Sequence, residues 1–258
     1  MAGVLDYVRA AKLDLELRTS WHARLRRGDG SVRMVQDLVR AGDVALDIGA
    51  SWGHYTSAMA RLVGDAGSVH AFEPNPANAR QLTLIALRHL NVTVHPVGLS
   101  DTRGEAELHV PVMRGRPITE RGSLGPIDVE TKKVPIVLER LDDVVDPELP
   151  VAFLKCDVEG HERDVFEGGA RLLERWRPPI LVEIERRHAH SDVHGTTALL
   201  ESMGYDAYMV SGEELIHASH FDPEVHQPSV ASSSERLPAG YVGDFLFLPP
   251  GRTPGSRA

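Results

Sequence analysis

The sequence predicts an α/β protein built on a doubly wound, mostly parallel β-sheet. Short apolar runs alternate along the chain with segments of helical periodicity, which is the pattern of successive βα units. The run Val151–Cys156 is almost continuously apolar, as expected of a strand buried on both faces. Glycines at positions 49 and 53 follow an earlier run and precede a helical segment. The 258 residues are enough for one large domain with decorations.

Residues 46–56 read Leu-Asp-Ile-Gly-Ala-Ser-Trp-Gly-His-Tyr-Thr and lie between a strand-like run at 43–46 and a helical segment at 57–63. A strand-loop-helix turn presents backbone N–H groups at a helix start, and its glycines let a ligand approach closely. The Asp47 carboxylate repels a pyrophosphate but suits a cationic or hydroxyl-bearing ligand. We therefore expect S-adenosylmethionine. The expected contacts in this loop are Asp47, Gly49, Ser51, Gly53, Tyr55 and Thr56, with packing beneath the loop as the alternative for Tyr55.

Two further acids follow the next apolar runs. Glu73 ends the run at 68–72, where an acid binds ribose hydroxyls in dinucleotide-type folds. Asp101 follows the run at 92–97, and we expect it to accept a hydrogen bond from the adenine amino group. A plain turn residue is the alternative for Asp101.

The N-terminal segment at 4–17 has helical periodicity, with Val4, Leu5, Val8, Ala11 and Leu15 on one side. This side either packs within the chain or pairs with a second subunit to give a homodimer. A second helix is expected at 32–40, ended by Gly42. The arginines at 24–33 lack interleaved aromatic residues, so we expect a solvated face and no nucleic-acid site.

In the middle of the chain, Asn75 and Pro76 have the residue types of a helix cap and first position, and Leu82, Ile85, Ala86 and Leu90 should point inward. Residues 105–112 and 134–138 are expected strands. Between them, residues 113–133 are irregular and rich in Gly and Pro. A loop of this length is uncommon unless it is functional or disordered, so we expect a lid or an acceptor-recognition segment.

The last third continues the alternation. Residues 151–156 form a strand, followed by a helix whose inner face carries Val165, Phe166, Leu172, Leu173 and Trp176. A further strand at 179–185 places Glu183 and Glu185 on one face. A helix at 196–203 and a strand at 245–248 complete the domain, and the following residues should be disordered.

Composition excludes several classes of protein. The net charge of −9 gives no electrostatic case for nucleic-acid binding. The single cysteine, Cys156, excludes an intramolecular disulfide and fits a reducing cytoplasm. No segment has the length and apolar character of a membrane span or a secretory signal. We therefore expect a cytoplasmic protein whose partner is a small-molecule acceptor.

The ordered set of motifs resembles the FkbM family of S-adenosylmethionine-dependent methyltransferases. The matching pieces are residues 47–56, 72–74, 141–143, 154–162, 179–185 and 245–248. The resemblance implies a class I methyltransferase (Rossmann-like) fold at 41–249, with an N-terminal helical extension at 1–40, an inserted loop and β segment, and a disordered tail at 250–258. It also implies O-methylation of a hydroxyl group on a sugar or on a natural product, and hence a role in natural product biosynthesis. The family usually has Asn where this chain has Ser51, whose small polar side chain should preserve cofactor binding.

The segment after the strand at 151–156 carries the candidate catalytic residues Asp157, Glu159 and His161, at the sheet edge where α/β proteins bind ligands. We expect Asp157 to organise the site and also to contact the cofactor, and His161 to act as a base or to be a surface residue at a helix start. A divalent metal such as Mg²⁺, held by Asp157 with Glu183 or Glu185, is the competing mechanism. A zinc site built from His188, His190 and His194 has less support because the spacing lacks cysteines.

Two other classes of function fit parts of the pattern. An NAD-dependent oxidoreductase shares the fold, but it requires a Gly-x-Gly-x-x-Gly turn, and here Gly49 and Gly53 are separated by Ala-Ser-Trp. A non-catalytic S-adenosylmethionine-binding module would keep the cofactor pocket without turnover. Methylation of nucleic-acid amines is disfavoured because the segment after residue 156 lacks an Asn/Asp-Pro-Pro-aromatic motif.

Overall fold

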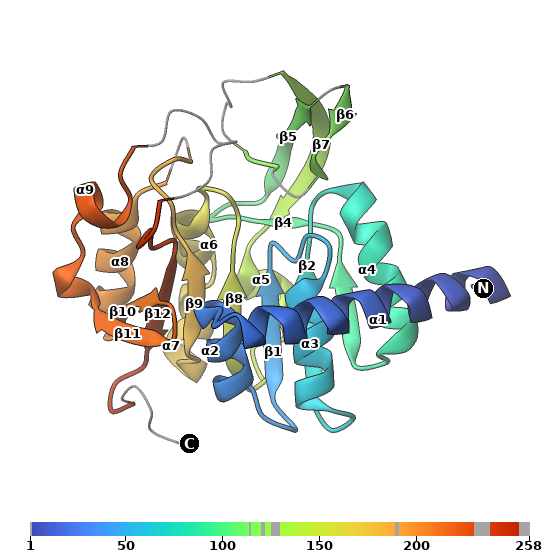
Figure 1. Ribbon diagram of the computed structural model, residues 1–258, viewed down its shortest axis with the longest axis horizontal. Helices are drawn as coiled ribbons and strands as arrows, with labels where there is room; N and C mark the ends of the chain where they lie inside the picture. The colour runs from blue at the N-terminus through green and yellow to red at the C-terminus, as the bar shows by residue number, and fades with distance from the viewer. Residues whose placement is uncertain are drawn as a thin grey trace.

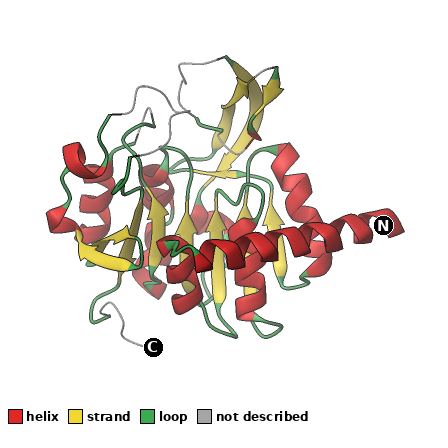
Figure 2. Ribbon diagram, in the orientation of Figure 1, coloured by secondary structure: helices red, strands yellow, loops and turns green. Residues whose placement is uncertain are grey.

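A computed structural model of the chain describes residues 2–113, 115–119, 122–124, 130–188, 191–229 and 238–252. Figures 1 and 2 show a central β-sheet with helices on both faces. Up to the insertion, the elements are α1 (Val4–Arg26), α2 (Gly30–Leu38), β1 (Val44–Ile48), α3 (His54–Val63), β2 (Ser68–Phe72), α4 (Pro76–Arg88), β3 (Val92–His95) and β4 (Gly98–Leu99). The insertion holds β5 (Gly104–Met113), β6 (Arg116–Pro117) and β7 (Thr131–Glu139). The remainder comprises α5 (Leu141–Val144), β8 (Val151–Cys156), α6 (Glu162–Gly168), α7 (Ala170–Trp176), β9 (Ile180–Glu183), α8 (Val193–Ser202), β10 (Asp206–Ser211), β11 (Glu214–His217), a 3₁₀ turn (Ala218–His220), α9 (Pro223–His226) and β12 (Asp244–Leu248).

Within the described residues the main sheet has eight strands in the order β11-β10-β12-β9-β8-β1-β2-β3. The strands from β9 to β3 are parallel to their neighbours, whereas β12, β10 and β11 pair in antiparallel fashion. The predicted doubly wound, mostly parallel sheet is confirmed. The chain moves outward from β1 to β3 and later returns to β8 on the other side of β1. This reversal opens a crevice at the carboxyl ends of β1 and β8, where such sheets bind ligands.

Apolar side chains from the strands form a core on each face of the sheet. On one face, Phe153 and Leu181 pack with residues of α2 and α3, including Val35 and Met59. On the other face, Leu154 packs among side chains from the helices that follow β8 and β9. Burial on both faces explains why these strands appear in the sequence as nearly unbroken apolar runs.

The insertion forms a small second sheet in the order β4-β7-β5-β6, above the carboxyl edge of the main sheet in Figure 1. β5 and β7 pair in antiparallel fashion from Gly104↔Leu138 to Pro111↔Thr131, so the predicted strands at 105–112 and 134–138 are confirmed. Of the expected lid at 113–133, residues 114, 120, 121 and 125–129 lie outside the described part of the chain.

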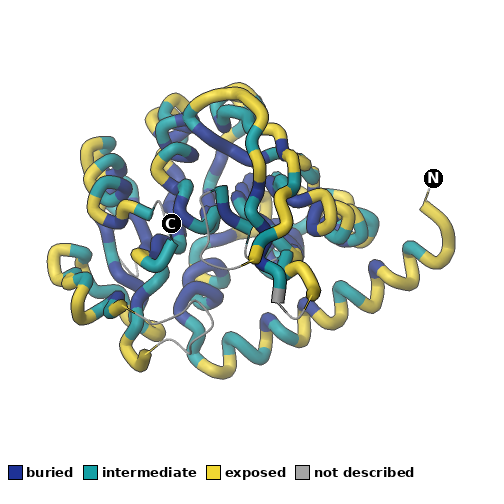
Figure 3. Tube along the Cα trace, turned by 90° about the horizontal axis from the view of Figure 1, so that it is seen from above, coloured by how far each residue is buried: buried dark blue, intermediate teal, exposed yellow. Residues whose placement is uncertain are grey.

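The N-terminal helix α1 extends to Arg26, beyond the predicted end at residue 17. It packs on α3 and α4 within the chain, but through a different face from the one predicted. Ala10, Leu17 and Trp21 are buried, whereas the predicted inner residues, including Val8 and Leu15, are exposed. Figure 3 shows the first turns of α1 extending away from the body. The prediction counted apolar residues, whereas burial follows the side of the helix that α3 and α4 cover.

Two other expectations need correction, and one element was not predicted. Leu90 was expected to point inward, but it lies beyond the end of α4 and is 96% exposed. The single helix expected after residue 161 is two helices, α6 and α7, separated at Gly169. The antiparallel hairpin β10–β11 was not predicted, because its strand at 206–211 mixes polar and apolar residues. Residues 253–258 of the expected disordered tail lie outside the described part of the chain.

The predicted cap of the helix after β2 is confirmed. Asn75 precedes α4 and its side chain accepts a hydrogen bond from the backbone N–H of Ala77 at 3.0 Å, with Pro76 at the first helical position. Among the described helices, none combines the length and apolar character needed to cross a bilayer.

Candidate active site

A cavity of about 660 Å³, counted with its open mouth, lies at the carboxyl ends of β1, β2 and β8 and beneath the small sheet. Its polar lining comes from the loop after β1, the end of β2 and the segment after β8. Its apolar lining comes largely from β4, β5 and β7. The described residues that line it are Ile48, Gly49, Ser51, Phe72, Glu73, Pro74, Val97, Gly98, Leu99, Leu108, Thr119, Gly122, Leu124, Ile136, Asp157, Val158, Glu159 and His161.

The glycine loop after β1 requires its two glycines for different contacts. Gly49 has φ of 74°, and a Cβ on it would lie 1.7 Å from the carbonyl oxygen of Asp157. Gly53 has φ of 81°, and its Cβ would lie 2.1 Å from Cδ1 of Ile85. The first glycine therefore lets β1 and β8 approach at the cavity, and the second lets α3 start close to α4. Ser51 also has a left-handed conformation, with φ of 49°.

The loop N–H groups are used within the protein, contrary to the expectation that they are free. The N–H groups of Gly49 and Ala50 both donate to the carbonyl oxygen of Phe72 at 3.0 Å. The Ser51 N–H donates to Oε2 of Glu73 at 2.8 Å. These bonds tie the loop to the end of β2, so the cavity wall is rigidly held before any ligand binds.

Glu73 lies where the sequence predicts a ribose-binding acid, at the end of β2 and in the cavity lining. Its side chain is buried, and its Oε1 accepts a hydrogen bond from the Asn75 N–H at 2.7 Å. Burial raises the pKa of Glu73 to about 7, against the opposing effect of the hydrogen bonds from Asn75 and Ser51. Each carboxylate oxygen retains a second lone pair, which can accept from a ligand hydroxyl.

Asp47 and Thr56 support the loop and are not part of the cavity lining. The Thr56 hydroxyl donates to Oδ2 of Asp47 at 2.5 Å, and both side chains are buried. Oδ1 of Asp47 is buried without a hydrogen-bond partner in the described part of the chain. Burial raises the pKa of Asp47, and the nearby Lys155 ammonium opposes this effect.

Tyr55 lies below the loop and outside the cavity lining. Its ring makes an edge contact with Trp21 of α1, with ring centroids 5.6 Å apart. The Arg24 guanidinium donates to its hydroxyl at 3.1 Å, so this arginine is not the solvated residue that the basic run predicted. The ammonium of Lys155 lies 4.8 Å from the ring centroid.

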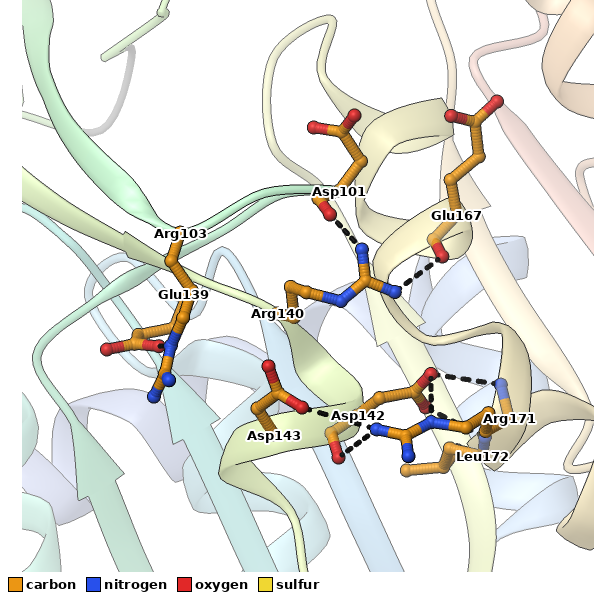
Figure 4. A network of polar contacts seen from close by, with 9 residues as sticks. All are labelled: Asp101, Arg103, Glu139, Arg140, Asp142, Asp143, Glu167, Arg171 and Leu172. Atoms are coloured by element: carbon orange, nitrogen blue, oxygen red, sulfur yellow. Dashed lines mark hydrogen bonds and ion pairs between the residues drawn. The ribbon is translucent and has the colours of Figure 1, made fainter.

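Asp101 lies apart from the cavity lining, two residues after the end of β4. Its Oδ1 accepts from the hydroxyls of Ser100 at 3.1 Å and Thr102 at 3.2 Å. The Arg140 guanidinium donates to the main-chain carbonyl of Asp101 and, at 3.4 Å, to that of Glu167 (Figure 4). The predicted contact with adenine would require this carboxylate to turn toward the cavity, and it stays a prediction.

Asp157 and Glu159 line the cavity just after β8. Oδ2 of Asp157 lies 2.8 Å from Nζ of Lys155, a lysine that is only 3% exposed. Burial by itself would lower the pKa of Lys155, but Asp157, Tyr55 and Asp47 raise it, so the ammonium remains charged. Glu159 has φ of 56°, and its Oε2 lies 2.7 Å from Nε2 of His188.

His161 also lines the cavity, but both of its ring nitrogens have partners. Nδ1 lies 2.8 Å from Oδ2 of Asp164, and Nε2 lies 3.0 Å from Oγ of Ser100. Nε2 of His161 could take a proton from the methyl-acceptor molecule only after its contact with Ser100 is broken. The geometry is that of a residue held in a fixed orientation at the cavity wall.

The described residues do not assemble the metal sites considered from the sequence. The three metal-ligating side chains whose oxygens lie within 4.8 Å of one another are Asp101, Asp164 and Glu167, outside the cavity. For the magnesium alternative, Asp157 is paired with Lys155 and Glu185 with Arg187. Glu183, the other ligand considered, lies at the level of Asp157, but in the described part of the chain the two do not belong to a group of three metal-ligating side chains. For the zinc alternative, His188 is paired with Glu159, and His190 lies outside the described part of the chain.

Sequence reasoning missed two kinds of site residue. Lys155 was treated as one position in an apolar run, although a lysine inside a buried strand is itself a signal of a charge partner. Leu108, Leu124 and Ile136 line the cavity from the insertion, and no local pattern shows that an inserted β-hairpin folds back over the carboxyl edge of the main sheet.

The insertion is held over the cavity by polar contacts with the main domain. Nε1 of Trp52 donates to Oγ1 of Thr119 at 3.1 Å, and the Asn78 side chain donates to the Thr119 carbonyl at 2.9 Å. The Ser123 hydroxyl donates to the carbonyl of Glu159 at 3.1 Å. The described part of the expected lid therefore covers the glycine loop and the segment after β8.

Three solved structures are similar to this chain, and the first of them supports the fold. A crystal structure of methyltransferase FkbM from Methylobacillus flagellatus KT aligns with a TM-score of 0.51 and 16% identity over 94% of this chain, which spans 60% of that protein. An S-adenosylmethionine-dependent O-methyltransferase from Thermotoga maritima gives a TM-score of 0.45 and 15% identity, covering 87% of this chain and 66% of that one. The Aeropyrum pernix fibrillarin, solved with bound S-adenosyl-L-methionine, gives a TM-score of 0.45 and 15% identity, covering 81% and 67%.

No curated protein matches the sequence. The methyltransferase FkbM domain profile, in contrast, matches residues 43–207, from the start of β1 into β10. The matched segment includes the glycine loop, Glu73 and the residues that follow β8. With the class I methyltransferase fold and this match over more than half of its length, the chain belongs to the FkbM methyltransferase family.

Proposed function

We propose that the protein is an S-adenosylmethionine-dependent methyltransferase that methylates a hydroxyl group of a small molecule. The observation that carries the proposal is the convergence of Gly49, Glu73 and Asp157 on one cavity at the β1/β8 reversal. The proposal also rests on membership of the FkbM methyltransferase family. An acceptor among sugars or other hydroxylated natural products is consistent with the many carboxylates near the cavity, since these accept hydrogen bonds from hydroxyls.

The cavity has the chemical groups that S-adenosylmethionine requires. Glu73 supplies a buried carboxylate for the ribose hydroxyls, and the close approach at Gly49 brings the glycine loop and the segment after β8 together at the cavity wall. Val97, Leu99 and Leu124 supply apolar surface for the adenine ring. When bound, this cofactor supplies a methyl group activated by a positively charged sulfur.

Asp157 and Glu159, which follow β8, are placed where they can orient the methyl acceptor. Asp157 is fixed by Lys155, and Glu159 is fixed by His188, so both carboxylates face the cavity in defined orientations. Alignment of the reacting groups alone can contribute on the order of 7 kcal/mol to methyl transfer. We assign Asp157 and Glu159 to orienting the acceptor, and His161 to the adjoining wall or, after release from Ser100, to proton transfer.

Calorimetric titration with S-adenosylhomocysteine, with and without Mg²⁺, tests the proposal. Binding with a Kd in the micromolar range or tighter is expected, together with weaker binding by Glu73→Ala and Asp47→Ala in proteins that keep the wild-type circular dichroism spectrum. The exposed substitution Glu201→Ala on α8 is the control. Binding of NADH without binding of S-adenosylhomocysteine would support the oxidoreductase alternative, and unchanged affinity in both variants would refute the pocket assignment.

Turnover separates an enzyme from a binding module. Methyl transfer from radiolabelled S-adenosylmethionine to neutral sugars and polyols is the expected activity. An intact cofactor site with no transfer to any tested acceptor would favour the non-catalytic module, and a requirement for Mg²⁺ would restore the metal-assisted mechanism.

A further inference from the structure

Three carboxylates form a row beside the cavity, on neighbouring strands at the same level. Cys156 of β8 pairs with Val182 of β9, so Asp157 follows at the level of Glu183. Glu183 in turn pairs with Asp244 of β12. Residues directly opposite one another in a sheet point to the same face, with Cβ atoms roughly 5 Å apart. We call Asp157, Glu183 and Asp244 the carboxylate row.

The members of the row differ in their partners. Asp157 is paired with Lys155 at 2.8 Å, and Asp244 accepts a hydrogen bond from the Ser31 hydroxyl at the start of α2. The Glu183 carboxylate has neither a hydrogen bond nor an ion pair with any residue in the described part of the chain. Protein surrounds Glu183 on almost every side, yet it keeps some accessible surface, as do Asp157 and Asp244. A buried polar group without a partner is costly unless a ligand satisfies it.

The N-terminal helices cover the face of the sheet that carries the row. α2 contacts β9 and β10. The α1 residue Arg24 donates to Oδ2 of Asp29 at 2.8 Å and to the Tyr55 hydroxyl at 3.1 Å. The Tyr55 ring in turn lies over the Lys155 ammonium. The extension at the N-terminus therefore adds charged side chains beside the row.

The row has the electrostatic character of a proton acceptor. Asp157, burial, Asp244 and Glu185 together raise the pKa of Glu183 well above its usual value, and Lys155 opposes them. Burial raises the pKa of Asp244 to about 6, with Ser31 and Lys155 opposing and Asp157 and Asp29 reinforcing the increase. Tyr241, near Glu183 and Glu185, and Arg187, paired with Glu185, also lie around this cluster.

We propose that the acceptor hydroxyl binds against the carboxylate row and that the Glu183 carboxylate takes its proton. This inference rests on the proposed methyltransferase function. The acceptor O–H bond breaks and its proton moves to Glu183, while the oxygen lone pair forms the bond to the methyl carbon. The electron pair of the broken carbon–sulfur bond stays on sulfur, which becomes neutral, and the proton on Glu183 leaves to solvent after the product departs. A carboxylate whose pKa is raised by burial and by neighbouring carboxylates binds a proton more strongly than an ordinary glutamate, which suits it to this step.

Glu183 suits this role better than His161. The two ring nitrogens of His161 are occupied by Asp164 and Ser100, whereas the Glu183 carboxylate has no hydrogen bond or ion pair in the described part of the chain and keeps some accessible surface. Asp157 belongs both to the row and to the cavity lining, so it connects the acceptor position to the cofactor cavity.

The charge around the row also restricts the acceptor class. Among the described residues, Asp157, Glu183 and Asp244 lie near the Lys155 ammonium and Glu185 is paired with Arg187, so carboxylates outnumber cations around the row. A carboxylated or phosphorylated acceptor would be repelled, whereas a neutral hydroxylated molecule can donate hydrogen bonds to the row. The geometry thus favours a neutral polyol or sugar hydroxyl.

The test compares S-adenosylmethionine with S-adenosylhomocysteine, which differ in the charge on sulfur. Their dissociation constants are measured by calorimetry from pH 5.5 to 8.5 in the wild type, Glu183→Gln and the exposed control Glu201→Gln. As Glu183 ionises, the affinity for the cation should rise relative to that for the neutral thioether by roughly 3- to 10-fold, the order expected of one charge at short range in protein. The rise should shrink in Glu183→Gln and remain in Glu201→Gln. Carboxyl ¹³C NMR of the free protein should place the Glu183 titration well above the usual range.

The outcomes separate this inference from the proposed function. If S-adenosylhomocysteine binds but the affinity ratio has the same pH dependence in wild type and Glu183→Gln, the role of Glu183 is refuted and the cofactor site stands. A normal titration of the Glu183 carboxyl would also refute it. If neither ligand binds the wild type, the proposed function fails first.

Discussion

The carboxylate of Glu73 accepts a hydrogen bond from the backbone N–H of Ser51 at 2.8 Å, across a separation of 22 residues. The contact joins the two positions that the sequence marks as cofactor-binding, one in the glycine loop and one at the end of β2. It also uses an N–H group that the loop would otherwise present to a ligand. Glu73 thus shapes the cavity wall before it meets any ligand, and its protonation state matters to both stability and binding.

The pH dependence of stability tests the state of Glu73. Burial raises its pKa from 4.5 to about 7, so the folded protein holds this proton more tightly than the unfolded chain. The stabilisation is complete below pH 4.5 and is lost as pH rises through 7, by about 3 kcal/mol. In Glu73→Gln this component is absent, so the difference in unfolding free energy between wild type and variant should decrease from pH 5 to pH 8. Urea denaturation at several pH values measures it, and a constant difference would contradict the raised pKa.

The close approach at Gly49 predicts a large effect of a single methyl group. Gly49→Ala places a Cβ 1.7 Å from a main-chain oxygen of Asp157, so β1 and β8 must separate. Gly64→Ala is the matched control, because Gly64 also has positive φ but no atom within 4 Å of the added Cβ. The control should lose about 1–2 kcal/mol of unfolding free energy because of backbone strain. Gly49→Ala should lose clearly more unfolding free energy than the control and should also bind S-adenosylhomocysteine more weakly than the wild type. Equal losses of unfolding free energy in the two variants would show that the steric contact is unimportant.

The hydrogen bond beneath the loop predicts the cost of removing a hydroxyl. Thr56→Val removes the hydroxyl that donates to Oδ2 of the buried Asp47 carboxylate. The loss should cost about 1–3 kcal/mol in unfolding free energy. Thr56→Ser keeps the hydroxyl and should lose less. Thermal and urea unfolding of the two variants provide the comparison, and a larger loss in the serine variant would assign the effect to the methyl group instead.

The buried ion pair of Lys155 predicts a pH-dependent loss of stability. Lys155→Met removes the cation next to Asp157 and Asp47, and breaking a buried pair on one side costs about 3–5 kcal/mol. The penalty should be smaller at pH 5 than at pH 8, because the carboxyls left behind can be protonated at low pH. Arg175→Met removes an exposed partner of Glu148 and should cost less than about 1 kcal/mol at either pH. A pH-independent loss in Lys155→Met would indicate lost packing and not an unpaired charge.

Local patterns determined much of the fold. The largely apolar run at β8, the glycines around the turn after β1 and the cap at Asn75 each depend on interactions within a few residues. Such interactions leave a readable pattern in the sequence, because a buried strand must be apolar and a tight turn must accept positive φ. The positions of Glu73 and Asp157 followed from the same rule, since acids directly after parallel strands meet at one edge of the sheet.

Which side chains face the cavity depended on contacts between distant segments. Tyr55 lies next to the glycines in sequence, yet it packs below the loop because Trp21 and Arg24 of α1 occupy that side. The apolar side of α1 was predicted to pack within the chain or against a second subunit; within the chain, α3 and α4 cover another side, and the pairing with a second subunit stays a prediction. Periodicity reveals that a helix has an apolar face and contains no information about which neighbour covers it.

The sequence by itself determined the sheet class, the glycine loop and the acids at the strand ends, because period, turn geometry and strand-end chemistry are local properties. Only the tertiary structure decided that Ser51 binds Glu73, that the insertion lines the cavity and that Glu183 lies between Asp157 and Asp244. Register between strands far apart in the chain brings these groups together. Register is set by the packing of the whole core, which no single segment of the sequence contains.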